Sequence, residues 1–136
     1  MAGKVDLGVL LAGMSPRLQP GVFVFATLPP GAPIPAGIEP VMIFRESEGV
    51  TLILGEGEAS KAGLAGTFRS RMITLEIHSS LDAVGFLGAI TTRLAMARMS
   101  VNPVSAFHHD HLFVPVDRAE EALLILDQLA AQASRG

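Results

Sequence analysis

The sequence contains no cysteine, tryptophan or tyrosine. Without cysteine the chain forms no disulfide, offers no thiolate nucleophile and builds no cysteine-based zinc or iron–sulfur site, which excludes several classes of enzyme. The same absence makes the cytoplasm the simplest expectation for its location.

Positive charge and long apolar runs are scarce as well. The chain has 10 Lys and Arg against 13 Asp and Glu, a formal net charge of −3. It therefore lacks the basic patch that binding to a phosphate backbone needs, and we expect no nucleic-acid partner. Although 49% of the residues are hydrophobic, no uninterrupted apolar run approaches the length of a membrane span, so we expect no membrane partner. The surplus apolar surface instead predicts an interface between two copies, that is, a homodimer.

The first half of the 136 residues predicts four elements and a loop. They are a short helix that Asp6 caps and Pro16 ends, a strand over 21–28, a hairpin over 41–54 that turns at Gly49, and a helix over 56–64. The segment 29–40 is rich in proline and predicts a stiff connecting loop.

The second half predicts strand, helix, strand, strand and helix. A strand over 72–78 precedes a helix that Ser79 caps, with Asp82 near its positive end. Two further strands, 101–107 and 112–116, flank a turn at residues 108–111, and Asp117 caps a last helix that runs to about residue 133. This order is typical of a ferredoxin-like α+β unit, in which helices cover one face of an antiparallel sheet.

Residues 73–107 resemble the ACT-domain superfamily of small-molecule regulatory modules in the sequence ITLEIHSSLDAVGFLGAITTRLAMARMSVNPVSAF. Gly85 and Asn102 stand where that pattern has its glycine and its strand-opening polar residue. The motifs FRESEGVTL (44–52) and HHDHLFVP (108–115) are similar to a small bacterial family of uncharacterised, free-standing tandem-ACT-like proteins. The resemblance implies tandem ACT-like units, an N-terminal half over 1–67 and a C-terminal ACT domain over 68–136.

The resemblance also implies a non-enzymatic sensor that binds a small molecule, of the amino-acid class, and needs no cofactor. The ligand would lie between the strand–helix turn of one unit and the second strand of a neighbour. The residues carried over are Ser79, Ser80, Leu81, Asp82, Ala83, Val84, Gly85 and Asn102. Free N–H groups at a helix start suit a carboxylate, and glycine lets a ligand approach the backbone. The plainer alternative is that Ser79 only caps the helix and Gly85 only permits packing.

The histidines define a second candidate site. In a ferredoxin-like unit the end of the first strand lies beside the central hairpin turn, so we expect His78 near His108, His109 and His111. Three or four imidazoles with Asp110 suffice for zinc or a similar metal, with His78, His109 and His111 as the candidate ligands, which would make the protein a metal-binding protein or a metal-dependent enzyme. A pH-sensitive surface turn is the simpler interpretation. A third hypothesis is a structural protein-interaction domain without a ligand.

Overall fold

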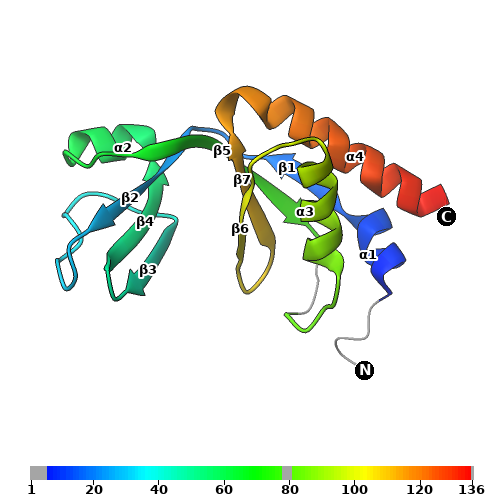
Figure 1. The fold of residues 1–136 in the computed structure, drawn as a ribbon, viewed down its shortest axis with the longest axis horizontal. Helices are drawn as coiled ribbons and strands as arrows, with labels where there is room; N and C mark the ends of the chain where they lie inside the picture. Colours follow the sequence, from blue (N-terminus) through cyan, green and yellow to red (C-terminus); the bar gives the residue numbers. More distant parts are fainter. Residues whose placement is uncertain (1–5, 78–80, 136) are drawn as a thin grey trace. The chain divides into compact units, whose positions relative to one another are not determined.

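The computed structural model describes residues 6–77 and 81–135, and the chain divides into two compact units (Figure 1). Unit 2 comprises residues 21–70, and unit 1 joins residues 1–20 to residues 71–136. This division differs from the predicted boundary between residues 67 and 68, because the N-terminal segment packs with the C-terminal half.

Unit 2 has the strand order β3-β4-β2-β5. Its elements are β2 (Phe23–Leu28), β3 (Met42–Glu46), β4 (Gly49–Gly55), α2 (Glu56–Lys61) and the first part of β5 (Thr67–Glu76). Alternate side chains on β2 and β4, such as Val24 and Leu54, form a buried cluster with Ala59 of α2. The predicted strand, hairpin and helix of this half are therefore confirmed.

The β3–β4 hairpin depends on Gly49. Its φ of 157° lies outside the range that side chains favour, and a Cβ added there would lie 2.4 Å from the carbonyl oxygen of Leu28. No larger residue fits without moving β2, because backbone cannot yield as a flexible side chain does. The sequence predicts a glycine here for the turn, and the structure shows that the close approach of the Leu28 carbonyl also requires one.

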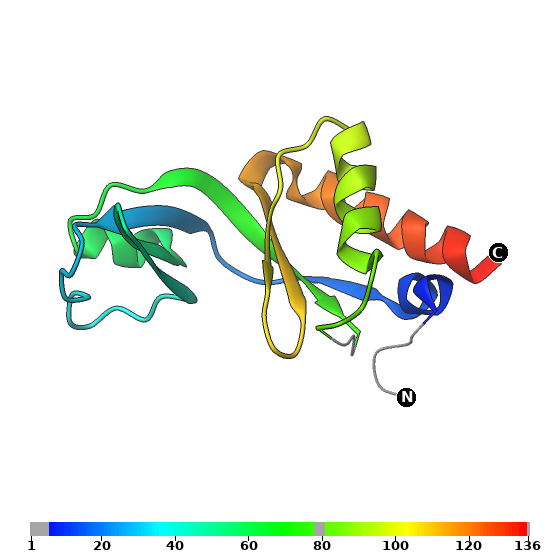
Figure 2. The ribbon, with the colours of Figure 1, turned by 60° about the horizontal axis from the view of Figure 1, so that its bottom comes forward.

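Unit 1 has the strand order β1-β5-β7-β6. Its elements are α1 (Leu7–Gly13), β1 (Ser15–Leu18), the second part of β5, α3 (Phe86–Met96), β6 (Asn102–Ser105), β7 (Asp110–Pro115), a 3-10 turn η1 (Val116–Arg118) and α4 (Ala119–Arg135). Helices α3 and α4 cover one face of this sheet (Figure 2). Their buried residues Ile90, Leu94 and Leu126 share one core with Leu75 of β5 and Val114 of β7. The ferredoxin-like α+β prediction is confirmed.

The N-terminal segment confirms one prediction and corrects another. Asp6 caps α1, because its Oδ1 accepts hydrogen bonds from the backbone N–H groups of Gly8 (2.7 Å) and Val9 (3.3 Å). Pro16, expected only to end the helix, lies inside β1 and pairs with Leu75 of β5. Proline is tolerated in β1 because β1 has a strand partner on one side only among the described strands.

Three predicted boundaries in the second half are wrong. Helix α3 begins at Phe86 and not after Ser79, because Gly85 adopts a left-handed φ of 88° at the N-cap and Asp82 precedes the helix. The hairpin turn lies at residues 106–109 and not 108–111, since β6 ends at Ser105 and β7 begins at Asp110. Strand β5 begins at Thr67 and not at residue 72.

Strand β5 contains a bulge at Phe68. The register against β2 shifts by one residue between the pairs Phe23–Ser70 and Phe25–Thr67, and Phe68 has a left-handed φ of 57°. Its ring packs edge-on against Phe25, with centroids 5.9 Å apart. Because bulges favour glycine at such a φ, a phenylalanine there hides the strand from sequence patterns.

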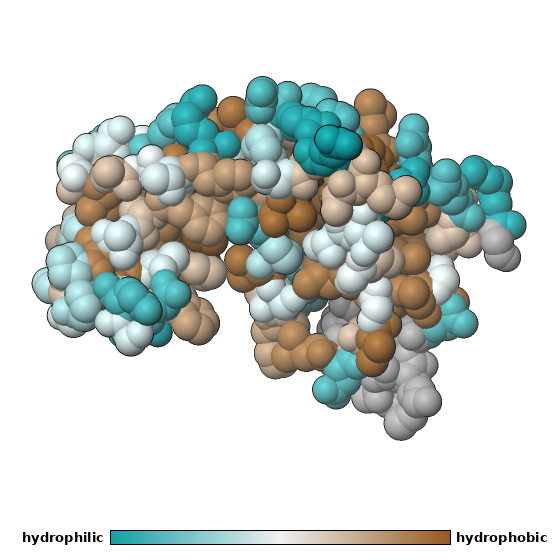
Figure 3. Space-filling view, viewed as in Figure 1, coloured by the Kyte–Doolittle hydropathy of each residue, from teal (hydrophilic) through white to brown (hydrophobic). Residues whose placement is uncertain are grey.

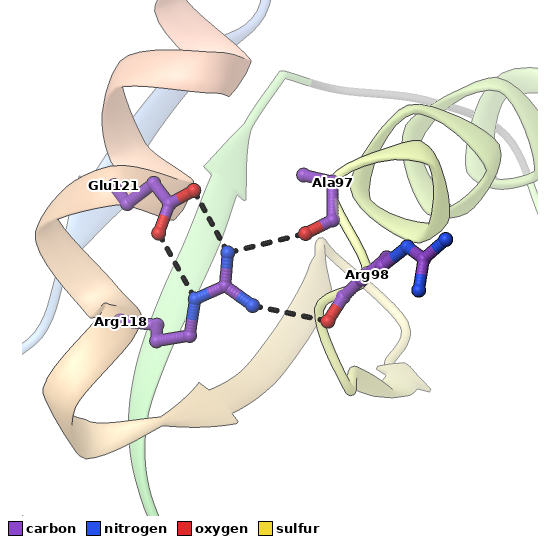
Figure 4. A network of polar contacts seen from close by, with 4 residues as sticks. All are labelled: Ala97, Arg98, Arg118 and Glu121. Atoms are coloured by element: carbon purple, nitrogen blue, oxygen red, sulfur yellow. Dashed lines mark hydrogen bonds and ion pairs between the residues drawn. The ribbon is translucent and has the colours of Figure 1, made fainter.

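Helix α3 ends in a Schellman motif whose left-handed residue is Arg98, with a φ of 56°. The N–H of Met99 donates to Leu94 O (3.1 Å) and that of Arg98 to Ala95 O (2.9 Å). The guanidinium of Arg118 donates to Ala97 O (3.1 Å) and Arg98 O (3.0 Å) and also pairs with Glu121 (Figure 4). Arg118 thus ties the strained end of α3 to the start of α4.

We predict that Arg98→Gly raises the free energy of unfolding by about 0.5–1 kcal/mol, because glycine adopts the left-handed conformation without strain. Arg118→Met should lower it, because the last carbonyl groups of α3 lose their donor. Urea unfolding followed by far-UV circular dichroism measures both changes. Arg135→Met, an exposed arginine in the last turn of α4, is the matched control and should leave the midpoint unchanged. Equal midpoints for Arg118→Met and the control would contradict the tie.

Candidate functional site

A pocket of about 170 Å³ lies in unit 1 between the start of α3 and the β6–β7 hairpin. Its first wall is apolar and consists of Leu81, Ala83, Phe86 and Leu87. Phe86 is buried in the unit 1 core, so this wall is fixed by packing. The left-handed Gly85 directs the chain from the loop into α3 and so sets where the wall begins.

The second wall is mostly polar and comes from the hairpin. It consists of Ser105, Ala106, His108, His109 and Asp110. Ser105 and Asp110 are opposite each other at the end of the ladder, and the Ser105 hydroxyl donates to Asp110 Oδ1 at 2.6 Å. His109 Nδ1 donates to the backbone oxygen of Ile77 at 3.4 Å. The two hairpin strands and the backbone of Ile77, just after β5, therefore hold these polar groups in place.

Exposed apolar side chains surround the pocket. Leu81, Val84 and Phe107 are 66%, 89% and 75% exposed, and brown surface gathers at this lower end of unit 1 in Figure 3. The ring of Phe107 contacts the His108 ring edge-on, with centroids 5.1 Å apart. Large exposed apolar residues beside a pocket are typical of a surface that contacts a ligand or a partner.

The structure brings some of the predicted ligand-binding residues together and separates one of them. Leu81 and Ala83 line the pocket, while Asp82 and Val84 are exposed in the same loop. Asn102 is not a lining residue. It opens β6 at the end opposite Ser105, about 10 Å away along the strand at ~3.3 Å per residue. Ser79 and Ser80 lie outside the described residues.

Four lining residues were not anticipated from the sequence: Phe86, Leu87, Ser105 and Ala106. The sequence predicted that α3 begins after Ser79, but it begins after Gly85. Phe86 and Leu87 are therefore its first residues and lie next to the loop. The last two follow from the earlier hairpin turn, which brings Ser105 opposite Asp110.

His111 belongs to a separate network on the sheet. Thr74 is nearly fully buried, and its hydroxyl oxygen lies 3.0 Å from Gln19 Nε2 and 3.0 Å from His111 Nδ1. Gln19 donates to this oxygen, and Thr74 and His111 share a second hydrogen bond in which the tautomer of the ring decides the donor.

The histidines predicted to bind metal are therefore engaged differently. His109 lines the pocket and contacts Ile77 O, whereas His111 contacts Thr74. Within residues 6–77 and 81–135 no three His, Asp or Glu side chains come together in a way that could hold a metal ion. His78 lies outside these residues.

The fold consists of two linked ferredoxin-like units, one of which contains the pocket described above. The ACT-domain family matches residues 2–71 and, separately, residues 67–128. The chain belongs to the ACT-domain family, whose members are typically regulatory domains that bind small molecules such as amino acids. No helix of the described ranges is long and apolar enough to cross a membrane.

Solved structures with this fold include a protein of unknown function from Vibrio cholerae, named as a possible transport protein. It is 40% identical, with a TM-score of 0.81, over 91% of this chain and 95% of that one. A protein from Agrobacterium tumefaciens is 18% identical, with a TM-score of 0.74, over 86% and 89% of the two chains. The ligand-free regulatory subunit of aspartate kinase from Thermus thermophilus is 12% identical, with a TM-score of 0.64, over 86% and 99%. No curated protein matches the sequence.

The His111 network predicts a loss of stability in acid. Burial lowers the pKa of His111, the charge of His109 lowers it further, and Asp110 raises it in part. The unfolded chain takes up the proton near the ordinary pKa of about 6.5, so stability that is present above this pH is lost as the pH falls through the lowered folded-state pKa.

His111→Gln should make this loss shallower, because the titrating group is gone. Urea unfolding between pH 7.5 and about pH 5 measures the slope, and His108→Gln, in the exposed hairpin turn, is the matched control. An unchanged slope in His111→Gln would contradict the assignment.

Proposed function

We propose that the protein is a non-enzymatic regulatory module that binds a small metabolite, of the amino-acid class, in the pocket of unit 1. The observation that carries the proposal is the pocket itself. It joins the loop before α3 to the β6–β7 hairpin in an ACT domain. Apolar residues form one wall and hydroxyl, imidazole and carboxylate groups the other, a combination that suits a small ligand with distinct polar and apolar parts.

In this proposal residues 79–85 and the start of α3 hold the carboxylate of the ligand. Gly85, the N-cap of α3, has no side chain to cap the helix, and the first N–H groups of a helix have no partner within the helix. A ligand carboxylate would satisfy them and would be stabilised by the helix dipole. Asn102 is exposed and is proposed to contribute a polar contact from a neighbouring subunit.

We also propose that the protein acts as a homodimer. Strand β3 is at the edge of unit 2, and its residues Ile43 and Phe44 are 41% and 61% exposed, next to Val41 at 50%. An edge strand with exposed apolar residues is a liability unless another surface covers it. Regulation would then pass from the ligand to a separate protein partner, as the regulatory subunit of a Thermus aspartate kinase is separate by its name.

We predict that at least one of the common amino acids binds and that Gly85→Val weakens this binding by about tenfold or more. Valine disfavours the φ of 88° at this position and places a branched side chain where the helix starts. Calorimetry and NMR amide shifts measure binding, since the chain has no tryptophan or tyrosine for fluorescence.

Gly88→Ala is the matched control, because a methyl group there meets no atom within 4 Å. It should bind like the unaltered protein. A complete amino-acid panel that produces neither heat nor amide shifts would remove the support for the proposal.

A further inference from the structure

Asp110 is the only carboxylate among the described residues that line the unit 1 pocket, and no lysine or arginine is among them; His108 and His109 also line it. An anionic side chain on a ligand would therefore meet a carboxylate without a compensating lysine or arginine, and like charges at short range repel more strongly in a partly buried site. The carboxylate of Asp110 favours a cationic group.

Asp110 is positioned to receive such a group. It is half-buried at the first position of β7, and the Ser105 hydroxyl fixes Oδ1 at 2.6 Å. A carboxylate has about four acceptor positions, so this bond leaves others for ligand N–H groups. Ser105 donates its only proton to Asp110 and presents its own lone pairs to a further donor. Both side chains thus act toward a ligand as acceptors.

The opposite wall is apolar and fixed in place. Phe86 is 3% exposed, and Leu87 packs against the unit 1 core, so neither residue moves aside cheaply. The pocket of about 170 Å³ has room for a short aliphatic body against this wall.

We infer that the pocket selects a small primary amine with a short aliphatic body, with the ammonium group on Asp110 and Ser105 and the carbon chain against Phe86 and Leu87. The inference rests on the proposed function and narrows it to aliphatic amino acids such as valine. Acidic amino acids are rejected by charge.

Four probes separate the parts of this inference: L-valine, isobutylamine (no carboxylate), 3-methylbutanoate (no ammonium) and L-glutamate. We expect L-valine to bind and to shift the amide signals of Ala83 and Ala106. Isobutylamine should bind more weakly at the same residues, and 3-methylbutanoate should not bind. The affinity for L-glutamate should be at least about tenfold lower than that for L-valine, the effect of ~1.4 kcal/mol.

Two variants test the residues. Asp110→Asn keeps the shape and an acceptor for Ser105 but loses the charge, and it should weaken L-valine binding about 10- to 100-fold. Asp127→Asn makes the same change on the exposed side of α4 and should have no effect. Leu87→Ala removes part of the apolar wall and should weaken L-valine binding while the other amide signals stay those of the folded protein.

The outcomes distinguish the inference from the proposed function. Binding of L-glutamate in place of L-valine, or unchanged affinity in Asp110→Asn, overturns the inference and leaves the proposed function standing. If no amino acid binds but isobutylamine shifts Ala83 and Ala106 in a way that depends on Asp110, amine selectivity is supported and the proposed function fails. Tight binding of 3-methylbutanoate at the same residues overturns the assignment of Asp110.

Discussion

The antiparallel pairing of β1 with β5 is the constraint on which unit 1 depends. Residues 15–18 pair with residues 73–76, so the sheet gains its outer strand from the far end of the sequence. The segment also brings α1, whose Leu10 and Leu11 join the core formed by α3 and α4. Pairing across such a separation has a large loop-closure cost, which unit 2 reduces by folding the intervening residues into a compact body.

Much of the fold could be predicted from local patterns. Asp6 before an apolar stripe, Gly49 between two alternating runs and the periodic last helix each produced the expected element, because propensity and tertiary context agree there. The wrong predictions occur where local propensity and tertiary context conflict. Pro16 argues against a strand, yet an edge position removes the objection. Phe68 breaks the alternation of β5 because the bulge turns one residue out of register.

For the candidate site, the sequence placed the loop before α3 and the His-rich hairpin at one edge, and a pocket lies between them. That this pocket binds a ligand stays a prediction. The exact lining residues depend on where α3 begins and where the hairpin turns, and sequence patterns predict both positions poorly. Ser79 is a better N-cap by composition than Gly85, so only the left-handed backbone at Gly85 reveals where α3 begins. Because the hairpin turn lies at residues 106–109 and not at 108–111, Ser105 lines the pocket and His111 does not.

The position of β1 has a consequence for the order of the elements along the chain. From Gly21 onward unit 2 reads strand, loop, strand, strand, helix, strand, and from residue 71 unit 1 reads strand, helix, strand, strand, helix, then α1 and β1. The two units therefore have related orders of helices and strands that differ by a circular permutation. Because α1 packs along α4 and Val9 shares a groove with Ala133, a chain opened between Pro20 and Gly21 and joined across its present ends would encode each unit as one uninterrupted sequence.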